Sequence, residues 1–214
     1  MNYNLSDFIH VEYNTLSEEF CNGVIGKFET DSRKRQGRLG SGKNSVVNVD
    51  IKDSVDLMIS GLDDWKEEDE VFFQSLTKNI QAYKDWVPKP YEMYVCGYRE
   101  IEDSGYQIQE TQPGGFYRWH HDGFLNRQLT VIWYLNDVSE GGHTEFSTGF
   151  KVQPEVGKVL MFPALWPWVH RGVPPKSGVK YLCTGWVSEL PLDEVDQANE
   201  TWVSAKPVEL MNNK

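Results

Sequence analysis

The sequence predicts a mainly β fold, a sandwich or jelly roll with helices packed on its outside. From residue 91 onward, short alternating or β-branched runs take the place of helical spacing. Turn residues separate these runs about every 8–12 positions, which is typical of sandwiches and barrels. The chain has 214 residues, of which 39% are hydrophobic, and this suits one domain with a sizeable core. We therefore expect a single domain over residues 1–214.

The N-terminal part, residues 1–90, is expected to be helical with one irregular segment. Apolar residues recur at helical spacing over about 16–28 and about 65–86, and these stretches predict two helices. Residues 31–45 are polar and rich in glycine, which predicts a mobile loop. The stretch "VVNVDI" that follows is typical of a short strand.

Residues 91–188 are expected to form the jelly-roll core. They contain eight strand-like runs: "YEMYVCGY", "GYQIQET", "FYRWHHD", "QLTVIWYL", "HTEFS", "KVLMF", "WVHRGV" and "VKYLCTGWV". Turn residues such as Pro-Gly and Gly-Gly pairs lie between them. Residues 189–214 form an acidic tail that predicts no particular element.

Charge and composition disfavour several classes of function. The chain has 21 Lys and Arg residues against 32 Asp and Glu residues, a net charge of −11, which disfavours binding to nucleic acid. No apolar stretch approaches the ~20 residues that span a membrane, and the first ten residues do not resemble a signal peptide. The three cysteines match no zinc or disulfide spacing, so we expect reduced thiols in a cytoplasmic protein.

The stretch "WHHDG" brings two imidazoles next to a carboxylate. On a strand, His120 and Asp122 would point to one face and His121 to the other. A later histidine, His170, lies in the strand-like run "WVHRGV". Two histidines and one carboxylate form the facial triad that binds non-haem Fe(II) and leaves positions open for other ligands. A polar surface turn is the alternative interpretation of "WHHDG" taken alone.

Lys180 is a second residue with chemical potential. In the run "VKYLCTGWV", alternation places Lys180 and Thr184 on the same strand face. A lysine that points inward from an apolar strand is costly unless it is paired, and a bound dicarboxylate would pair it. The alternative is an exposed lysine on an edge strand.

Together these segments resemble one enzyme family. The order "PGGFYRWHHDGF", "LTVIWYLND", "EGGHTEFS", "PEVGKVLMFP" and "HRGVPPKSGVKYLCTGW" is similar to the prolyl 4-hydroxylase type of Fe(II)/2-oxoglutarate-dependent dioxygenase. The resemblance covers about residues 91–188 and implies a double-stranded β-helix, which is a jelly roll. It also implies Fe(II), 2-oxoglutarate and O2 as cofactors, with ascorbate as a reductant.

Site residues follow from the resemblance position by position. It implies that His120, Asp122 and His170 hold the iron and that Lys180 binds the far carboxylate of 2-oxoglutarate. Further residues are expected to contact the same co-substrate or to line its pocket: Tyr134, Thr184 and Ile132. Where many members carry a tyrosine before the Pro-Gly turn, this chain has Thr111.

The substrate side is expected to involve four residues: Tyr117, Trp168, Arg33 and Arg35. The two arginines belong to the basic loop 31–45, which would act as a lid that attracts a carboxylate-bearing substrate; a solvated flexible loop is the alternative. Of the remaining histidines, His121 is expected to be packed or solvated, His143 to be structural or to line the rim of the site, and His10 to lie at the surface.

The resemblance implies hydroxylation of an unactivated C–H bond with release of succinate and CO2. A peptidyl proline is its default substrate, and a free amino acid or small metabolite is the alternative. A jelly-roll binding protein without turnover is the alternative of another class. Neither nucleic acid nor membrane is expected as a partner, and the sequence does not define an oligomeric state.

Overall fold

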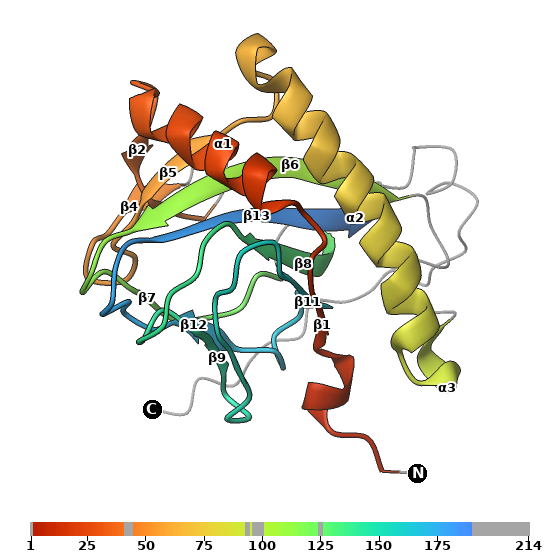
Figure 1. Ribbon diagram of the computed structural model, residues 1–214. Helices are drawn as coiled ribbons and strands as arrows, with labels where there is room; N and C mark the ends of the chain where they lie inside the picture. Colours follow the sequence, from red (N-terminus) through yellow and green to blue (C-terminus); the bar gives the residue numbers. More distant parts are fainter. Residues whose placement is uncertain (1, 41–44, 93–94, 96–100, 124–125, 190–214) are drawn as a thin grey trace, which may run out of the picture.

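The computed structural model describes residues 2–40, 45–92, 95, 101–123 and 126–189. Two antiparallel sheets lie against each other, and helices α1 (Glu18–Thr30) and α2 (Lys66–Trp86) cover the outer face of the larger sheet (Figure 1). The larger sheet has the strand order β1-β11-β8-β13-β6-β5-β2, and the smaller one has the order β10-β9-β12-β7. This confirms the mainly β jelly roll with external helices. Among the helices of these residues, none combines the length and the apolar run that crossing a bilayer requires.

The strands of the larger sheet are β1 (His10–Glu12), β2 (Arg35–Gln36), β5 (Val55–Met58), β6 (Ile101–Thr111), β8 (Arg127–Tyr134), β11 (Val159–Pro163) and β13 (Lys180–Glu189). Those of the smaller sheet are β7 (Tyr117–His120), β9 (Thr144–Phe146), β10 (Lys151–Val152) and β12 (His170–Gly172). The hairpin β3 (Arg38–Leu39) and β4 (Val46–Val47) and the short helices η1 (Leu5–Phe8), η3 (Asp63–Trp65) and α3 (Lys89–Glu92) complete the elements.

Strand alternation separates two apolar cores. On β8, Leu129, Val131 and Trp133 face the helices, while Ile132 and Tyr134 face the smaller sheet. The first core is the larger one and contains the buried faces of α1 and α2. The second fills the space between the sheets. Because side chains of a strand alternate, the residues that face the second core also face the space in which the histidines meet.

Seven of the eight strand-like runs contain a strand: β6, β7, β8, β9, β11, β12 and β13. The eighth, "YEMYVCGY", begins within α3, and most of its remainder lies outside the described residues. Both N-terminal helices also form. The first begins two residues later than expected, because the Ser17 hydroxyl accepts the Phe20 N–H and caps the helix there.

Two N-terminal expectations differ from the structure. Within the segment 31–45, the described part contains the short strands β2 and β3 in place of a loop, because Gly37 donates its N–H to the Ser54 carbonyl at 2.8 Å. Residues 41–44 lie outside the described part. His10, expected at the surface, is buried on β1, where β11 pairs with it and α2 contributes Tyr83 and Trp86 beside it.

Candidate active site

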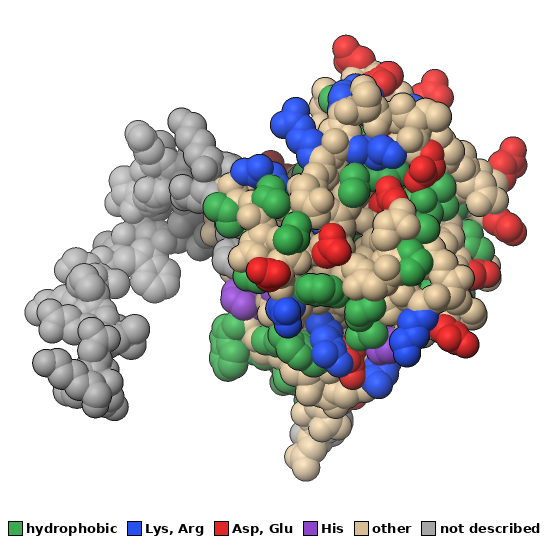
Figure 2. All heavy atoms as spheres, turned by 90° about the vertical axis from the view of Figure 1, so that its left-hand side faces the viewer, with side chains coloured by type: hydrophobic (Ala, Val, Ile, Leu, Met, Phe, Trp, Pro, Cys, Tyr) green, Lys and Arg blue, Asp and Glu red, His purple; other side chains and the backbone are tan. Residues whose placement is uncertain are grey.

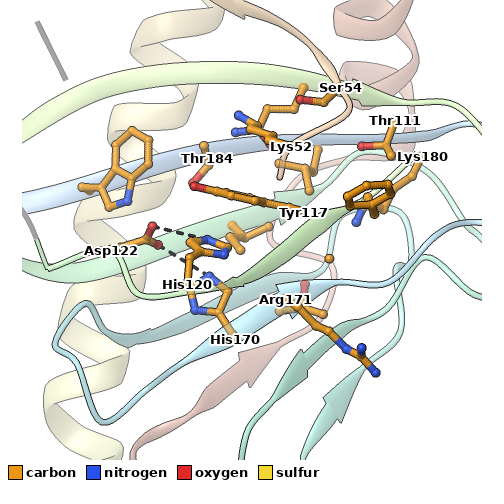
Figure 3. A pocket seen from close by; sticks show the side chains of 17 residues that line it. Lys52, Ser54, Thr111, Tyr117, His120, Asp122, His170, Arg171, Lys180 and Thr184 are labelled. Atoms are coloured by element: carbon orange, nitrogen blue, oxygen red, sulfur yellow. Dashed lines mark ion pairs between the residues drawn. The ribbon is translucent and has the colours of Figure 1, made fainter. Parts of the chain in front are cut away.

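His120, Asp122 and His170 come together from two strands of the smaller sheet. β7 ends at His120, Asp122 follows two residues later, and β12 begins at His170, which pairs with His120 across the sheet. Asp122 places Oδ1 3.7 Å from Nε2 of His120 and Oδ2 3.7 Å from Nε2 of His170 (Figure 3). One ligand atom from each residue lies within 4.8 Å of the others. The three side chains can therefore face a single metal ion.

Hydrogen bonds fix the orientation of all three groups. Nδ1 of His120 lies 2.8 Å, and Nδ1 of His170 lies 3.1 Å, from the carbonyl of the residue two positions earlier. A proton on Nδ1 donates to that carbonyl and leaves the Nε2 lone pair directed at the cluster. Thr130 on β8 donates its hydroxyl to Asp122 at 2.8 Å. These contacts have the form of the outer shell that orients metal ligands.

The protonation states also suit a metal. Burial, together with the neighbouring His170, lowers the pKa of His120 to about 3, so this imidazole is neutral at physiological pH. Burial pushes the pKa of Asp122 upward, but the two histidines and the Thr130 hydroxyl outweigh it, and the pKa lies below its usual value. Metal binding requires neutral imidazoles and a carboxylate, and this donor set is that of non-haem Fe(II).

His121 and His143 lie outside this cluster. The Nδ1 of His121 accepts the Gly123 N–H at 3.2 Å, and the residue is not part of the metal-binding group. His143 belongs to neither that group nor the lining of the adjoining cavity. The structure thus places both histidines outside the cluster, and the assignment of His120 and His170 as ligands stays a prediction.

A cavity of about 70 Å³ adjoins the cluster and ends at Lys180 (Figure 3). Lys180 is only 4% exposed, and its ammonium donates to the Gly142 carbonyl at 3.0 Å. Among the described residues no carboxylate forms an ion pair with it. Burial lowers the pKa of Lys180 to about 8. β13 lies between β8 and β6, so Lys180 is an inward lysine and not an exposed edge residue.

Of the other residues expected near Lys180, some line the cavity and one packs behind a residue that lines it. Ile132 and Thr184 line the cavity, and Thr111, where a tyrosine was expected, pairs with Lys180 across the strands and also lines it. Tyr134 lies in the layer behind. Its hydroxyl donates to Thr144 at 2.7 Å, and Thr144 presents its side chain to the cavity instead.

Tyr117 connects the cluster to a second buried lysine. Its ring stacks on His120 with the ring centroids 3.5 Å apart. The Tyr117 ring also contacts Lys52, whose ammonium lies 5.3 Å from the ring centroid. Lys52 is itself paired with Asp56 at 2.6 Å, and Ser54 donates to the same carboxylate at 2.8 Å. Tyr117, expected on the substrate side, thus lines the cavity beside the cluster, and its contact with substrate stays a prediction.

Three residues expected to contact substrate lie elsewhere. Trp168 packs against Phe8 and donates its indole N–H to the Leu5 carbonyl at 3.0 Å, so it lines a separate apolar cavity. Arg33 is held in ion pairs with two carboxylates, Asp31 and Asp64. Arg35 and Arg33 border another cavity that contains none of the cluster residues. Ion pairing and strand formation thus direct both arginines away from the site.

Sequence reasoning missed several residues that the fold brings to the site: Lys52, Ser54, Gln109, Phe116, Thr144, Arg171, Gly172, Leu182 and Trp186. The alternation that identified Lys180 and Thr184 could also have identified Leu182 and Trp186, because all four residues share one face of the strand. The "IKDSVDL" stretch carried a weaker signal, since it places a lysine four residues before an aspartate. Their pairing depends on β5, which was not expected.

Known proteins resemble this chain over the region that contains the histidine–aspartate cluster and Lys180. The sequence model of the 2OG-Fe(II) oxygenase superfamily matches residues 106–188, which include His120, Asp122, His170 and Lys180. A protein named "Probable prolyl 4-hydroxylase 3" from Arabidopsis thaliana is 26% identical over 147 residues, which are 50% of this chain and 51% of that protein. The chain thus spans about half the length of that relative.

Solved structures share the fold over most of the chain. A prolyl hydroxylase from Trichoplax adhaerens, solved with a hypoxia inducible factor peptide fragment, superposes with a TM-score of 0.68 at 17% identity and covers 92% of this chain and 89% of its own. The viral collagen prolyl hydroxylase of Paramecium Bursaria Chlorella virus-1, solved with 2OG, has a TM-score of 0.58 at 19% identity and covers 86% and 97%.

Proposed function

The chain belongs to the 2OG-Fe(II) oxygenase superfamily, and from this premise we propose that it is a dioxygenase that hydroxylates an unactivated C–H bond. The co-substrates are 2-oxoglutarate and O2, the products from 2-oxoglutarate are succinate and CO2, and ascorbate serves as a reductant. We further propose that residues 1–214 form one domain. In support, the N-terminal β1 and the late β13 belong to the same sheet.

His120, Asp122 and His170 would hold the iron, because their ligand atoms converge and the protonation states of His120 and Asp122 fit a metal site. Bound Fe(II) supplies the redox chemistry with O2 that no side chain can provide. The chain's own contribution is positioning. The Nδ1 contacts of both histidines and the Thr130 hydroxyl fix the ligands in place, so that little reorganisation is needed when the metal binds.

Lys180 would bind the far carboxylate of 2-oxoglutarate. Its burial in the same cavity as the cluster, with no carboxylate partner in the described part of the chain, is the observation that carries the proposal. A buried cation is strongly destabilising when left unpaired, and a dicarboxylate of the right length would pair it. Thr111, Thr144 and Thr184 add hydroxyl groups around this end, and Ile132 and Leu182 give it apolar walls. The Tyr134 hydroxyl acts through Thr144.

A peptidyl proline is the proposed substrate, because the relatives that resemble the chain carry prolyl hydroxylase names. A free amino acid or small metabolite is the alternative within the same reaction class. Tyr117, whose ring covers His120, would contact either substrate. We place the protein in the cytoplasm, because Cys21 and Cys183 are free thiols. The net charge of −11 supports the absence of a nucleic-acid partner.

The decisive experiment is succinate formation from 2-oxoglutarate with and without Fe(II), in the presence of proline-containing peptides or free amino acids. We expect iron-dependent succinate, and a product whose mass has increased by one oxygen atom in one of the two substrate sets. His120→Ala provides the matched blank. A jelly-roll binding protein would give no succinate above that blank with either set, and this result would overturn the proposal.

A further inference from the structure

A second cavity adjoins the first one at the metal cluster. It has a volume of about 270 Å³, just below the ~300–1,000 Å³ of small-molecule pockets. The two cavities share five lining residues: Lys52, Gln109, Tyr117, Asp122 and Trp186. Lys180 lines only the first cavity. A molecule in the second cavity would thus reach the cluster without occupying the position proposed for 2-oxoglutarate.

Arg127, at the start of β8, contributes a half-buried cation to the second cavity. Its guanidinium carbon lies 3.7 Å from the ring centroid of Trp186, which is a cation–π contact. Burial lowers the pKa of Arg127, and the nearby Asp122 carboxylate opposes this shift. Among the described residues no carboxylate forms a direct ion pair with Arg127, so the group is partly desolvated and compensated only at longer range.

Arg38 contributes the second cation, from strand β3 at the rim. Its Nε donates to the Ser45 hydroxyl at 2.9 Å, so its one described side-chain partner is neutral. Close packing at Gly37 fixes this strand. A Cβ atom at position 37 would lie 2.5 Å from Oγ of Ser54 and 3.1 Å from Cε of Lys52. Figure 2 shows the face at the β2 end of the molecule, where Lys and Arg side chains are interspersed with hydrophobic and acidic ones.

The polar groups of Trp186 and Lys52 differ in whether they have a partner. The indole Nε1 of Trp186 is buried and finds no acceptor among the described residues, although the side chain lines both cavities. A buried donor without an acceptor is costly. Lys52, by contrast, is neutralised by Asp56 at 2.6 Å. The second cavity therefore contains two guanidinium groups, Arg127 and Arg38, with no direct carboxylate partner among the described residues, and it suits a ligand that carries negative charge.

We propose that the second cavity binds a carboxylate of the primary substrate, paired with Arg127 and Arg38 beside the Trp186 ring. The proposal rests on the proposed function and names its substrate class. The carboxylate belongs either to a free acid, such as an amino acid, or to an acidic residue of a peptide. In both cases the reacting carbon lies on the side of Asp122, which both cavities share.

The test uses the protein loaded with Fe(II) and saturating 2-oxoglutarate without O2, so that the Lys180 position is filled and no turnover occurs. Binding is measured calorimetrically for three pairs of probes that differ only in charge. These are L-proline with L-prolinamide, L-glutamate with L-glutamine, and a proline-containing peptide carrying a glutamate with the same peptide carrying a glutamine.

We expect at least one acid to bind about tenfold or more tightly than its amide, the scale of one charge-assisted hydrogen bond. Arg127→Gln and Arg38→Gln should each remove most of this preference, and Arg127→Lys should retain part of it. The control Arg118→Gln removes the same charge from an exposed β7 side chain that lines neither cavity, and it should keep the preference. A preference in the amino-acid pairs points to a free acid, and one in the peptide pair points to an acidic peptide.

Equal binding of acid and amide in all three pairs overturns the inference, as does a preference that survives Arg127→Gln. The visible absorption band of Fe(II)-bound 2-oxoglutarate, recorded on the same samples, separates this failure from failure of the proposed function. A normal band with no acid preference rejects only the second cavity's role. Absence of the band in the wild-type protein rejects the proposed function itself, and the inference with it.

Discussion

The direction of single side chains decides which of two neighbouring histidines belongs to the candidate metal site. His120 points its Nε2 toward Asp122, whereas His121 uses its Nδ1 to accept a backbone N–H from Gly123. The two residues have the same chemistry and differ in position: β7 ends at His120, and His121 lies just beyond the strand. The local backbone therefore distinguishes two histidines that residue type cannot.

The first prediction tests this direction. His120→Ala should abolish Fe(II) binding, because it removes one of the three converging ligands, while His121→Ala should leave the iron affinity within a few-fold of wild type. Anaerobic Fe(II) titration measures both. Equal damage from the two substitutions would contradict the ligand assignment, and circular dichroism of each variant controls for misfolding.

Lys180 carries the second prediction. Lys180→Ala should weaken 2-oxoglutarate binding by roughly 2–5 kcal/mol, the usual cost of removing one partner of a buried charge pair. Fe(II) affinity should be unchanged, because the cluster does not include Lys180. Lys180→Arg should recover only part of the loss, since the guanidinium is planar and differs in reach. Titration of the Fe(II)–2-oxoglutarate absorption band gives the affinities, and equal midpoints in wild type and Lys180→Ala would exclude this residue as the anchor.

The lowered pKa of Lys180 adds a pH dependence. Burial depresses it from 10.5 to about 8, so above pH 8 the folded protein loses the proton that the unfolded chain retains up to about pH 10.5. Below pH 8 the buried ammonium costs stability, and this cost is relieved as the pH rises from 8 to 10.5. The free energy of unfolding should rise through that window relative to Lys180→Met, measured by urea denaturation. Affinity for 2-oxoglutarate should fall over the same window, because the ammonium is its partner. A parallel pH profile for both proteins would refute this.

At the scale of elements, short strands bring the N-terminal segment to the site. β2 and β5 pair through Gln36 and Val55, and Gly37 then passes so close to Ser54 that no side chain fits. Because Gly37 does not have a positive φ, the requirement for glycine there is steric. This contact places Arg38 at the rim of the second cavity.

Two glycine substitutions test the close contact. Gly37→Ala should destabilise the fold by about 1–3 kcal/mol, the usual cost of overpacking, because its Cβ would lie 2.5 Å from Oγ of Ser54. Gly26→Ala, within α1 and with no atom within 4 Å of the added Cβ, should stabilise it by about 0.5–1 kcal/mol through helix propensity. Chemical denaturation measures both, and a neutral Gly37→Ala would show that the strand is not tightly packed there.

At the scale of the whole molecule, periodicity explains what the sequence could and could not predict. The two helices and seven of the strand-like runs follow from local patterns. His120 and Asp122 are two residues apart in one such run, and the family resemblance implies His170 as the third residue of the candidate triad. The two-residue strands β2 and β3 leave no such pattern. The partners of Arg33 and of Trp168 come from segments distant in sequence, Asp64 and Leu5. Tertiary contacts of this kind placed those two side chains away from the site.

The site also joins the two sheets, which leads to a prediction about the stability of the whole fold. His120 and His170 belong to the smaller sheet, Asp122 is bonded to Thr130 on β8 of the larger one, and Lys180 lies on β13 of the larger one. Ligands that bind only the folded state stabilise it by mass action, and 2-oxoglutarate at one hundred times its Kd should add about 2.7 kcal/mol to the iron-loaded protein.

The comparison with Lys180→Ala shows where that stabilisation arises. At the same 2-oxoglutarate concentration the variant should gain far less, because its Kd has risen, while the gain from Fe(II) alone should equal that of wild type. Urea denaturation of both proteins, with each ligand added in turn, provides the four values. If 2-oxoglutarate stabilised wild type and variant equally, the co-substrate would be bound elsewhere, and the buried ammonium would need another partner.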